Sequence, residues 1–163
     1  MREPSTLYAQ FLMCLKKNSE YLYYEQEKLK IAEELDSKII LFNAVHDMAV
    51  SYQEMKNYEK FAEYTKRSLK LIPDMDDDYY LTAVYFNIAR AYYQQLDFEK
   101  ALEFFLKSLT IADKYKDLWK SEYPRNGFIY YHNLGGVYKQ LGNLNEALMY
   151  YKKGIENYLR DWR

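Results

Sequence analysis

Two groups of side chains in this sequence could bind a metal ion: an acidic run and a pair of histidines. The acidic run, DMDDD at residues 74–78, resembles the opening of a calcium-binding loop. However, Tyr79 and Tyr85 stand where such a loop needs its glycine and its bidentate glutamate. The only histidines, His46 and His132, lie far apart in the chain, so we expect them to be too distant to share one ion. The sequence therefore predicts no metal site.

Patterns for covalent catalysis are absent from the sequence. It contains no Gly-rich phosphate-binding loop and no nucleophile elbow. Cys14 is the only cysteine, which excludes an intrachain disulfide and a cysteine-based zinc site. We expect a protein that is not an enzyme and that uses no cofactor.

The charge and hydropathy of the chain narrow its possible partners. The formal net charge is −1 over 163 residues, so a surface for direct binding of nucleic acid is not implied. The longest apolar runs are only a few residues long, too short to cross a membrane. The apolar patch FLMCL near the amino terminus lacks the flanks of a signal peptide. We expect a cytoplasmic protein with one domain over residues 1–163.

Three segments of the chain align with one another, from Val45 to Leu69, from Tyr85 to Leu109 and from Tyr131 to Ile155. In each copy the apolar residues fall at i, i+3, i+4 and i+7, the spacing of one helical face. A short polar turn, EMKN, QQLD or QLGN, separates two helices within each copy. Each copy therefore predicts an antiparallel helical hairpin. Because a hairpin with one apolar face cannot bury that face alone, the copies must stack.

The shared pattern resembles the tetratricopeptide repeat family: leucine and a small residue, then tyrosine, then alanine, an aromatic and another small residue. The resemblance covers residues 40–158 well and residues 5–36 poorly. It implies an all-α solenoid of about four hairpins, at residues 5–36 (degenerate), 42–75, 82–115 and 128–161. These repeats are longer than the family's usual repeat of about 34 residues. In that respect they are similar to the repeats of bacterial peptide-pheromone receptors and of some scaffold proteins.

Glycines in the last copy have separate explanations. Gly135 aligns with Ala49 and Ala89, so we expect all three to be small because another helix backbone crosses there. Gly142 is expected to end its helix in a left-handed conformation. Gly136 has no packing explanation, because its counterparts in the other copies are not small. A glycine there would let a ligand approach the helix backbone, or leave room for a bulky side chain.

Between the last two copies, Pro124 breaks the preceding helix, and Asn126 is expected to cap the next helix.

The first helix of each copy has a second face that packing does not use. This face mixes aromatic rings, histidine, amides and a few charges, which is the chemistry of a peptide groove rather than of a solvated surface. The alternative is that these residues only solvate the face. The candidate peptide-binding residues are Asn43, His46, Asp47, Phe86, Asn87, Arg90, Tyr93, Gln94, His132, Asn133, Gly136, Lys139 and Gln140.

Within this set, Asn87 and Asn133 each carry an amide that can both donate and accept a hydrogen bond. The family resemblance implies that asparagines at this repeat position pair with the backbone of a bound peptide. Asp47 departs from that pattern, because a carboxylate accepts but does not donate. Arg90 and Lys139 could hold a carboxylate of the ligand.

The sequence thus favours a module that binds a protein or an extended peptide, with no direct role for nucleic acid or membrane. The alternative is a self-association or scaffold module, as part of a larger transcriptional regulator or signalling protein. The last helix carries an apolar face that includes Tyr150, Tyr151, Ile155 and Tyr158, and Trp162 alone is too small to cover it. We therefore expect a homo-oligomer formed through an uncapped terminal repeat, or docking of a missing segment there.

Overall fold

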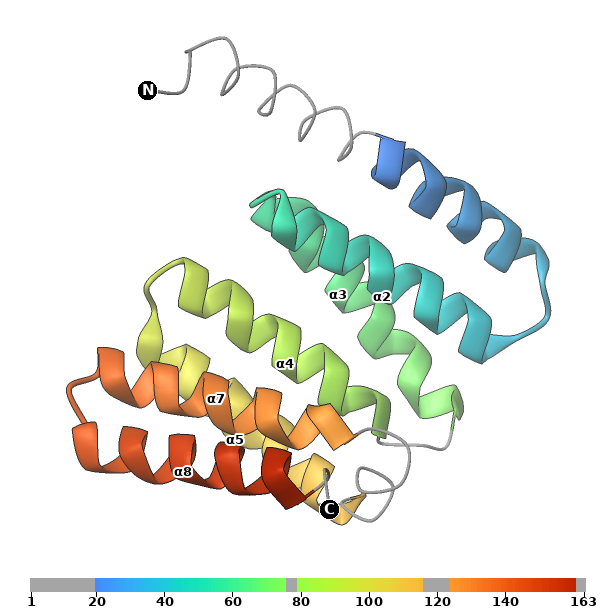
Figure 1. Ribbon diagram of the computed structural model, residues 1–163. Coiled ribbons are helices and arrows are strands. Elements are labelled where there is room, and N and C mark those ends of the chain that lie inside the picture. Colours follow the sequence, from blue (N-terminus) through green and yellow to red (C-terminus); the bar gives the residue numbers. More distant parts are fainter. Residues whose placement is uncertain (1–19, 76–78, 116–123, 161–163) are drawn as a thin grey trace, which may run out of the picture. The chain divides into compact units, whose positions relative to one another are not determined.

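The computed structural model describes residues 20–75, 79–115 and 124–160, and these ranges contain helices and no strand (Figure 1). Residues 5–19 of the first expected repeat, Asp76–Asp78 of the acidic run and Trp162 lie outside the described residues. The described helices are residues 20–34, α2 (Lys38–Glu54), α3 (Tyr58–Leu71), the 3-10 helix η1 (Ile72–Met75), α4 (Tyr79–Gln94), α5 (Phe98–Lys114), α7 (Pro124–Gln140) and α8 (Leu144–Arg160). The predicted all-α class is confirmed.

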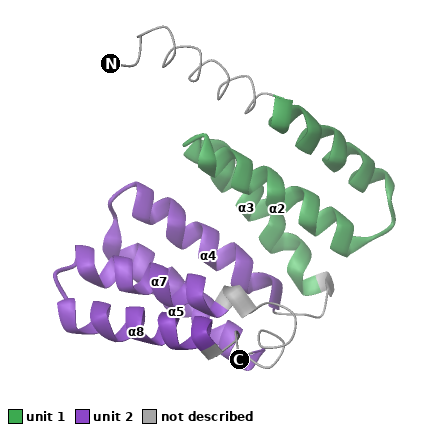
Figure 2. Cartoon of the chain, in the orientation of Figure 1, with its two compact units in different colours: residues 1–75 green, residues 76–163 purple. Residues whose placement is uncertain are grey.

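The chain divides into two compact units, which Figure 2 shows in different colours. Unit 1 comprises Met1–Met75 and contains helix 20–34 with the hairpin of α2 and α3. Unit 2 comprises Asp76–Arg163 and contains two hairpins, α4 with α5 and α7 with α8. In unit 2 the second helix of one hairpin, α5, packs against the first helix of the next, α7. This stacking of hairpins is the arrangement of an α-solenoid.

The turns inside the three hairpins share one backbone design. Each contains a residue with positive φ at the same place: Lys56 (57°), Leu96 (64°) and Gly142 (79°). In the first two turns the next residue, Asn57 or Asp97, caps the following helix by accepting a hydrogen bond from a backbone N–H in its first turn. The left-handed conformation expected for Gly142 is therefore confirmed. The backbone of Lys56 and of Leu96 adopts the same conformation, at a steric cost because both residues carry a Cβ atom.

An aromatic stack joins the two helices of every hairpin on one side. In each pair a ring of the first helix lies against a ring of the second helix. The two ring planes are nearly parallel in the closest pair, Tyr138 with Tyr150. The pairs are Tyr52 with Tyr64, Tyr92 with Phe104 and Tyr138 with Tyr150, with ring centroids 5.4, 5.7 and 5.3 Å apart. Such pairs add to the burial of apolar surface that holds a hairpin together.

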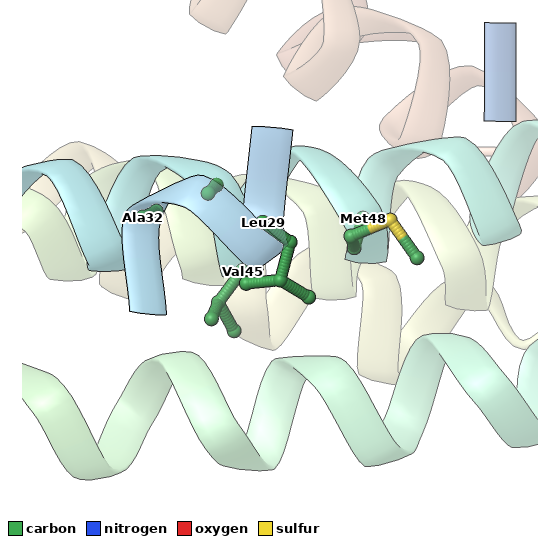
Figure 3. Packing of buried hydrophobic residues seen from close by; sticks show 5 residues of the cluster. Leu29, Ala32, Val45 and Met48 are labelled. Atoms are coloured by element: carbon green, nitrogen blue, oxygen red, sulfur yellow. The ribbon is translucent and has the colours of Figure 1, made fainter. Parts of the chain in front are cut away.

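The core of unit 1 joins helix 20–34 to α2. Figure 3 shows Leu29 and Ala32 of the first helix beside Val45 and Met48 of α2. All four side chains are buried. Helix 20–34 therefore packs on α2 as α5 packs on α7, and its assignment as the second helix of a degenerate copy stays a prediction.

The core of unit 2 contains small residues where helices approach closely. Ala89 of α4 and Ala101 of α5 are fully buried and lie in one cluster with Phe105, Leu134 and Val137. Substituting a larger side chain at either alanine would push α4 and α5 apart, because interiors are packed to nearly crystalline density.

Two local expectations are corrected by the structure. A Cβ atom added to Gly135 would lie 2.7 Å from the ring of Tyr151, so a side chain of α8, and not a crossing backbone, requires the glycine. Asn126 is not a cap, because α7 already begins at Pro124. Proline suits the first position of a helix, since its fixed φ is helical and that position needs no N–H donor.

Candidate functional site

In unit 1 the candidate residues of α2 lie on an edge that is only partly open. Asn43 is exposed, whereas His46 is half-buried and stacks on Phe42 with ring centroids 5.5 Å apart. Burial lowers the pKa of His46, although the neighbouring Asp47 acts in the opposite direction. The lowered pKa favours the neutral imidazole of His46, which therefore offers a ligand an aromatic ring and not a positive charge.

Asp47 is already engaged inside unit 1. The Lys28 ammonium, on helix 20–34, lies 2.6 Å from the Asp47 carboxylate and 2.5 Å from the carboxylate of Glu25. Partial burial opposes the charge of Lys28, but its hydrogen bonds to these two carboxylates raise the pKa of Lys28 overall. A ligand that is to bind Asp47 must compete with Lys28 for it.

In unit 2 the candidates of α4 differ in how accessible they are. Phe86 is partly buried and packs edge-on against Phe105 and Tyr130, with ring centroids 5.3 and 4.9 Å away, so its ring lies against the core cluster of the unit. Asn87 is only 8% exposed. Arg90 is half-buried and Gln94 is exposed.

The candidates in the middle of α7 are more open. His132 is exposed, and its ring lies 5.6 Å from that of Phe128 and 5.5 Å from that of Tyr151. The Asn133 amide donates one hydrogen bond to the backbone carbonyl of Ile129, at 2.7 Å. Its second amide hydrogen and its carbonyl oxygen are not used by that bond, so Asn133 keeps one donor and one acceptor for a ligand.

Three helices converge around Gly136. A Cβ atom added to Gly136 would lie 3.8 Å from the hydroxyl of Tyr151 on α8 and 4.0 Å from the hydroxyl of Tyr93 on α4. Gln140, one turn further along α7, donates a long hydrogen bond of 3.5 Å to the Tyr93 hydroxyl. The structure thus brings together three of the predicted residues, Tyr93, Gly136 and Gln140.

The sequence did not single out Tyr151 as part of this site. It aligns with Phe105 of the preceding copy, and the sequence places it on the apolar face of the last helix with Tyr150, Ile155 and Tyr158. The hydroxyl group of Tyr151 was the one feature of the sequence that could have indicated its role in the site. A tyrosine at a buried position places its polar tip at the edge of the core.

The comparisons with known proteins decide the family. A sequence profile described as "Tetratricopeptide repeat" matches residues 41–114, and a second profile of the same description matches residues 129–159. The chain belongs to the tetratricopeptide repeat family. Tetratricopeptide repeats generally mediate interactions between proteins or act as scaffolds. No curated protein matches the sequence.

Among solved structures, this tetratricopeptide repeat chain is similar to BtubC (BKLC) from P. vanneervenii, with a TM-score of 0.71 and 21% sequence identity. The match covers 88% of this chain and 57% of the BtubC chain, so our chain spans little more than half of that protein's length. At this identity the similarity shows a common fold. The narrower similarity to peptide-pheromone receptors, inferred from repeat length, stays a prediction.

The first helices of the tetratricopeptide repeats in unit 2 have an uneven charge. Neither α4 nor α7 contains an aspartate or glutamate, whereas the two helices contain Arg90, Arg125 and Lys139. In unit 1, by contrast, α2 contains Asp47 and Glu54. Helices α4 and α7 therefore each have a positive formal charge.

Within the described ranges, no three histidine, cysteine or acidic side chains come together as metal ligands could. The described helices likewise include none with the length and apolar content that crossing a membrane requires.

Proposed function

We propose that this protein binds a partner protein through an extended peptide segment, held in a groove lined by the first helices of the unit 2 repeats, α4 and α7. Membership of the tetratricopeptide repeat family supports a role in binding proteins. The convergence of Tyr93, Gly136, Gln140 and Tyr151 carries the proposal, because it brings polar groups from three helices together beside a residue that has no side chain. A few convergent polar groups among aromatic rings are typical of binding sites. A cytoplasmic location remains our expectation.

The distribution of charged pairs supports a binding groove on the first helices. The alternative is a face whose residues only contact solvent. Exposed pairs such as Lys60 with Glu63 on α3 and Lys107 with Glu103 on α5 lie on the second helices. Helices α4 and α7 cannot form such pairs within themselves, because they contain no acidic residue. The first helices of unit 2 therefore differ in charge from the second helices, as we expect of a face that binds another molecule.

Selection from a displayed library of random linear peptides, followed by fluorescence anisotropy with the selected peptides, tests this function. We expect Asn133→Ala to weaken binding about tenfold, because it leaves peptide backbone groups unpaired. Glu103→Ala, on the second helix α5, is the matched control and should bind like the wild type. Failure of the wild type to select any peptide would overturn the proposal, as would equal binding by the Asn133 variant.

A self-association or scaffold role is the second candidate, and one observation favours it. Leu148 and Ile155 of α8 are 54% and 53% exposed. The residues that align with them in α5, Leu102 and Leu109, pack on the core cluster that α5 shares with α7. A helix of a second copy could cover α8 in the same way, since apolar patches favour association.

Sedimentation over a wide range of protein concentration separates the two candidates. Self-association through α8 predicts a dimer or larger species that Ile155→Lys converts to monomer. A wild-type protein that is monomeric at the highest concentration would exclude this second candidate and leave the first untouched.

A further inference from the structure

Helix α8, red in Figure 1, has a second apolar face that the described residues of unit 2 leave open. Its first face packs on α7 and includes the buried Ala147 and Gly154. At 3.6 residues per turn, four aliphatic side chains of α8 lie within about 60° of one another on a different side of the helix. We call them the α8 stripe, and each is more than half exposed: Leu144, Leu148, Ile155 and Leu159.

The equivalent face of α5 shows what normally covers such a stripe. Leu102 and Leu109 of α5 align with two members of the α8 stripe, and they pack on the core cluster that α5 shares with α7. Between them α5 has Leu106, whereas α8 has Lys152 at the aligned place. Helix α7 contains no acidic residue. A helix like α7 would therefore cover the α8 stripe but would leave the charge of Lys152 without a partner, which is costly in a contact.

Helix α8 itself contains an acid in the right place. Glu156 follows Lys152 by one turn, so both lie along the same border of the α8 stripe. Both side chains are exposed, and among the described residues neither forms an ion pair. A second copy of α8 would therefore supply an acid for Lys152 and a base for Glu156.

The spacing of the α8 stripe is the same when it is read in either direction. Its members are separated by 4, 7 and 4 residues. An antiparallel second copy therefore places Leu144 opposite Leu159 and Leu148 opposite Ile155, and the same contacts repeat on the other side of the two-fold axis. Such a self-complementary surface is what a symmetric dimer requires.

The same register brings Lys152 close to Glu156 of the second copy. Residue 151 of the second copy lies opposite Lys152, so Glu156 lies five residues further on, about 7.5 Å along the helix axis. Side chains of an α-helix lean toward its amino terminus. In an antiparallel pair these two long side chains therefore lean toward each other and can span that offset.

We propose that α8 pairs with α8 of a second copy of this chain, antiparallel about a two-fold axis. The α8 stripe forms the centre of the contact, and two ion pairs between Lys152 and Glu156 border it. The inference rests on the proposed self-association and adds to it the helix, its direction and the charged pairs that select it. Because a two-fold contact closes on itself, the product is a dimer and not a filament.

Reversal of single charges tests this pairing. Sedimentation equilibrium over a wide range of concentration measures the dissociation constant of the dimer for the full chain. Lys152→Glu and Glu156→Lys each bring like charges together at two places, and each should weaken the dimer at least about tenfold. Glu146→Lys makes the same change of charge on the side of α8 away from the stripe and is the matched control, which should dimerise like the wild type.

An equal mixture of the Lys152→Glu and Glu156→Lys proteins provides the decisive measurement. In a mixed dimer both contacts again join opposite charges, so the mixture should recover most of the affinity that each variant lost. Recovery would also show that both variants are folded, because a misfolded chain could not restore the contact.

The outcomes separate this pairing from self-association in general. A wild type that stays monomeric at the highest concentration would overturn both. A wild-type dimer that tolerates both single variants, or a mixture no tighter than its components, would leave self-association standing and overturn the antiparallel α8 pair. Species that keep growing with concentration would indicate an open, head-to-tail contact, and they too would overturn the two-fold pair.

Discussion

The ring of Tyr138 lies almost parallel to the ring of Tyr150, with planes 8° apart and centroids 5.3 Å apart. The ammonium of Lys153 lies 5.3 Å from the centroid of the Tyr150 ring. The stack joins α7 to α8 at the same place where Tyr52 meets Tyr64 in the first hairpin. Its recurrence indicates that each hairpin is held together along this side by one pair of aromatic rings.

Tyr138→Ala should therefore destabilise the protein by roughly 2–4 kcal/mol, since it removes the stack and opens the space between α7 and α8. Tyr138→Phe keeps the ring and should cost much less. Chemical denaturation followed by circular dichroism measures both values. An alanine variant as stable as the wild type would show that the stack does not hold the hairpin.

The neighbouring glycines of α7 should respond to alanine in opposite directions. Gly135→Ala places a methyl group against the Tyr151 ring and should destabilise the protein by roughly 1–3 kcal/mol. Gly136→Ala meets only ordinary contacts and should stabilise it by about 0.5–1 kcal/mol. Thermal unfolding of the two variants in parallel provides the check. Equal destabilisation by both would contradict the difference in packing.

The turn between α4 and α5 contains a strained residue that can be relieved. Leu96 has a φ of 64° and is 72% exposed, so its side chain gains little from burial. We expect Leu96→Gly to raise the free energy of unfolding by about 0.5–1 kcal/mol, because glycine adopts positive φ without the steric cost of a Cβ atom. Leu96→Ala retains the Cβ atom and serves as the control. A gain that is equal in both variants would assign the effect to loss of the exposed leucine instead.

Stability should fall at high pH because of a buried phenol. Burial raises the pKa of Tyr130 to about 12. A tyrosine in the unfolded chain has a pKa of about 10. The folded state therefore keeps a proton that the unfolded state loses. The contribution of Tyr130 is fully present below pH 10 and is lost as the pH rises from about 10 to about 12.

Urea unfolding at a series of alkaline pH values measures this loss, which should reach roughly 2 kcal/mol for Tyr130. Tyr130→Phe has no proton to lose and should show a shallower decline above pH 10. Identical slopes for the two proteins would mean that other tyrosines, such as Tyr64 and Tyr150, whose pKa burial also raises, cause the whole effect.

The helical hairpins and their turns were predictable because they depend on local information. The spacing of apolar residues defines one face of a helix over a few turns. Short-range chemistry also sets the turns, in which a residue of positive φ precedes an asparagine or aspartate cap. Internal repetition strengthened this prediction, since the same pattern recurs in each copy, and the family matches agree with it.

Contacts between helices could not be predicted from the same pattern. Periodicity places Phe86 and Asn87 at the border between the packed face and the open face, and only the neighbours decide which side they join. Tyr130 and Phe105 hold the partly buried ring of Phe86 against the core cluster, and Asn87 is itself buried, with only 8% of its surface exposed. A rotation of the helix by a fraction of a turn would change this outcome without changing the pattern.

The candidate site shows the same division between sequence and tertiary structure. The sequence alone determined the family, the helical class and the unusual glycine at position 136. Tertiary structure decided that Lys28 engages Asp47 and that the hydroxyls of Tyr93 and Tyr151 meet at Gly136. The physical reason is that hydrogen bonds and ion pairs act over a few ångströms, so they depend on the axial shift and rotation of each helix against its neighbours, whereas apolar periodicity depends only on residues within one helix.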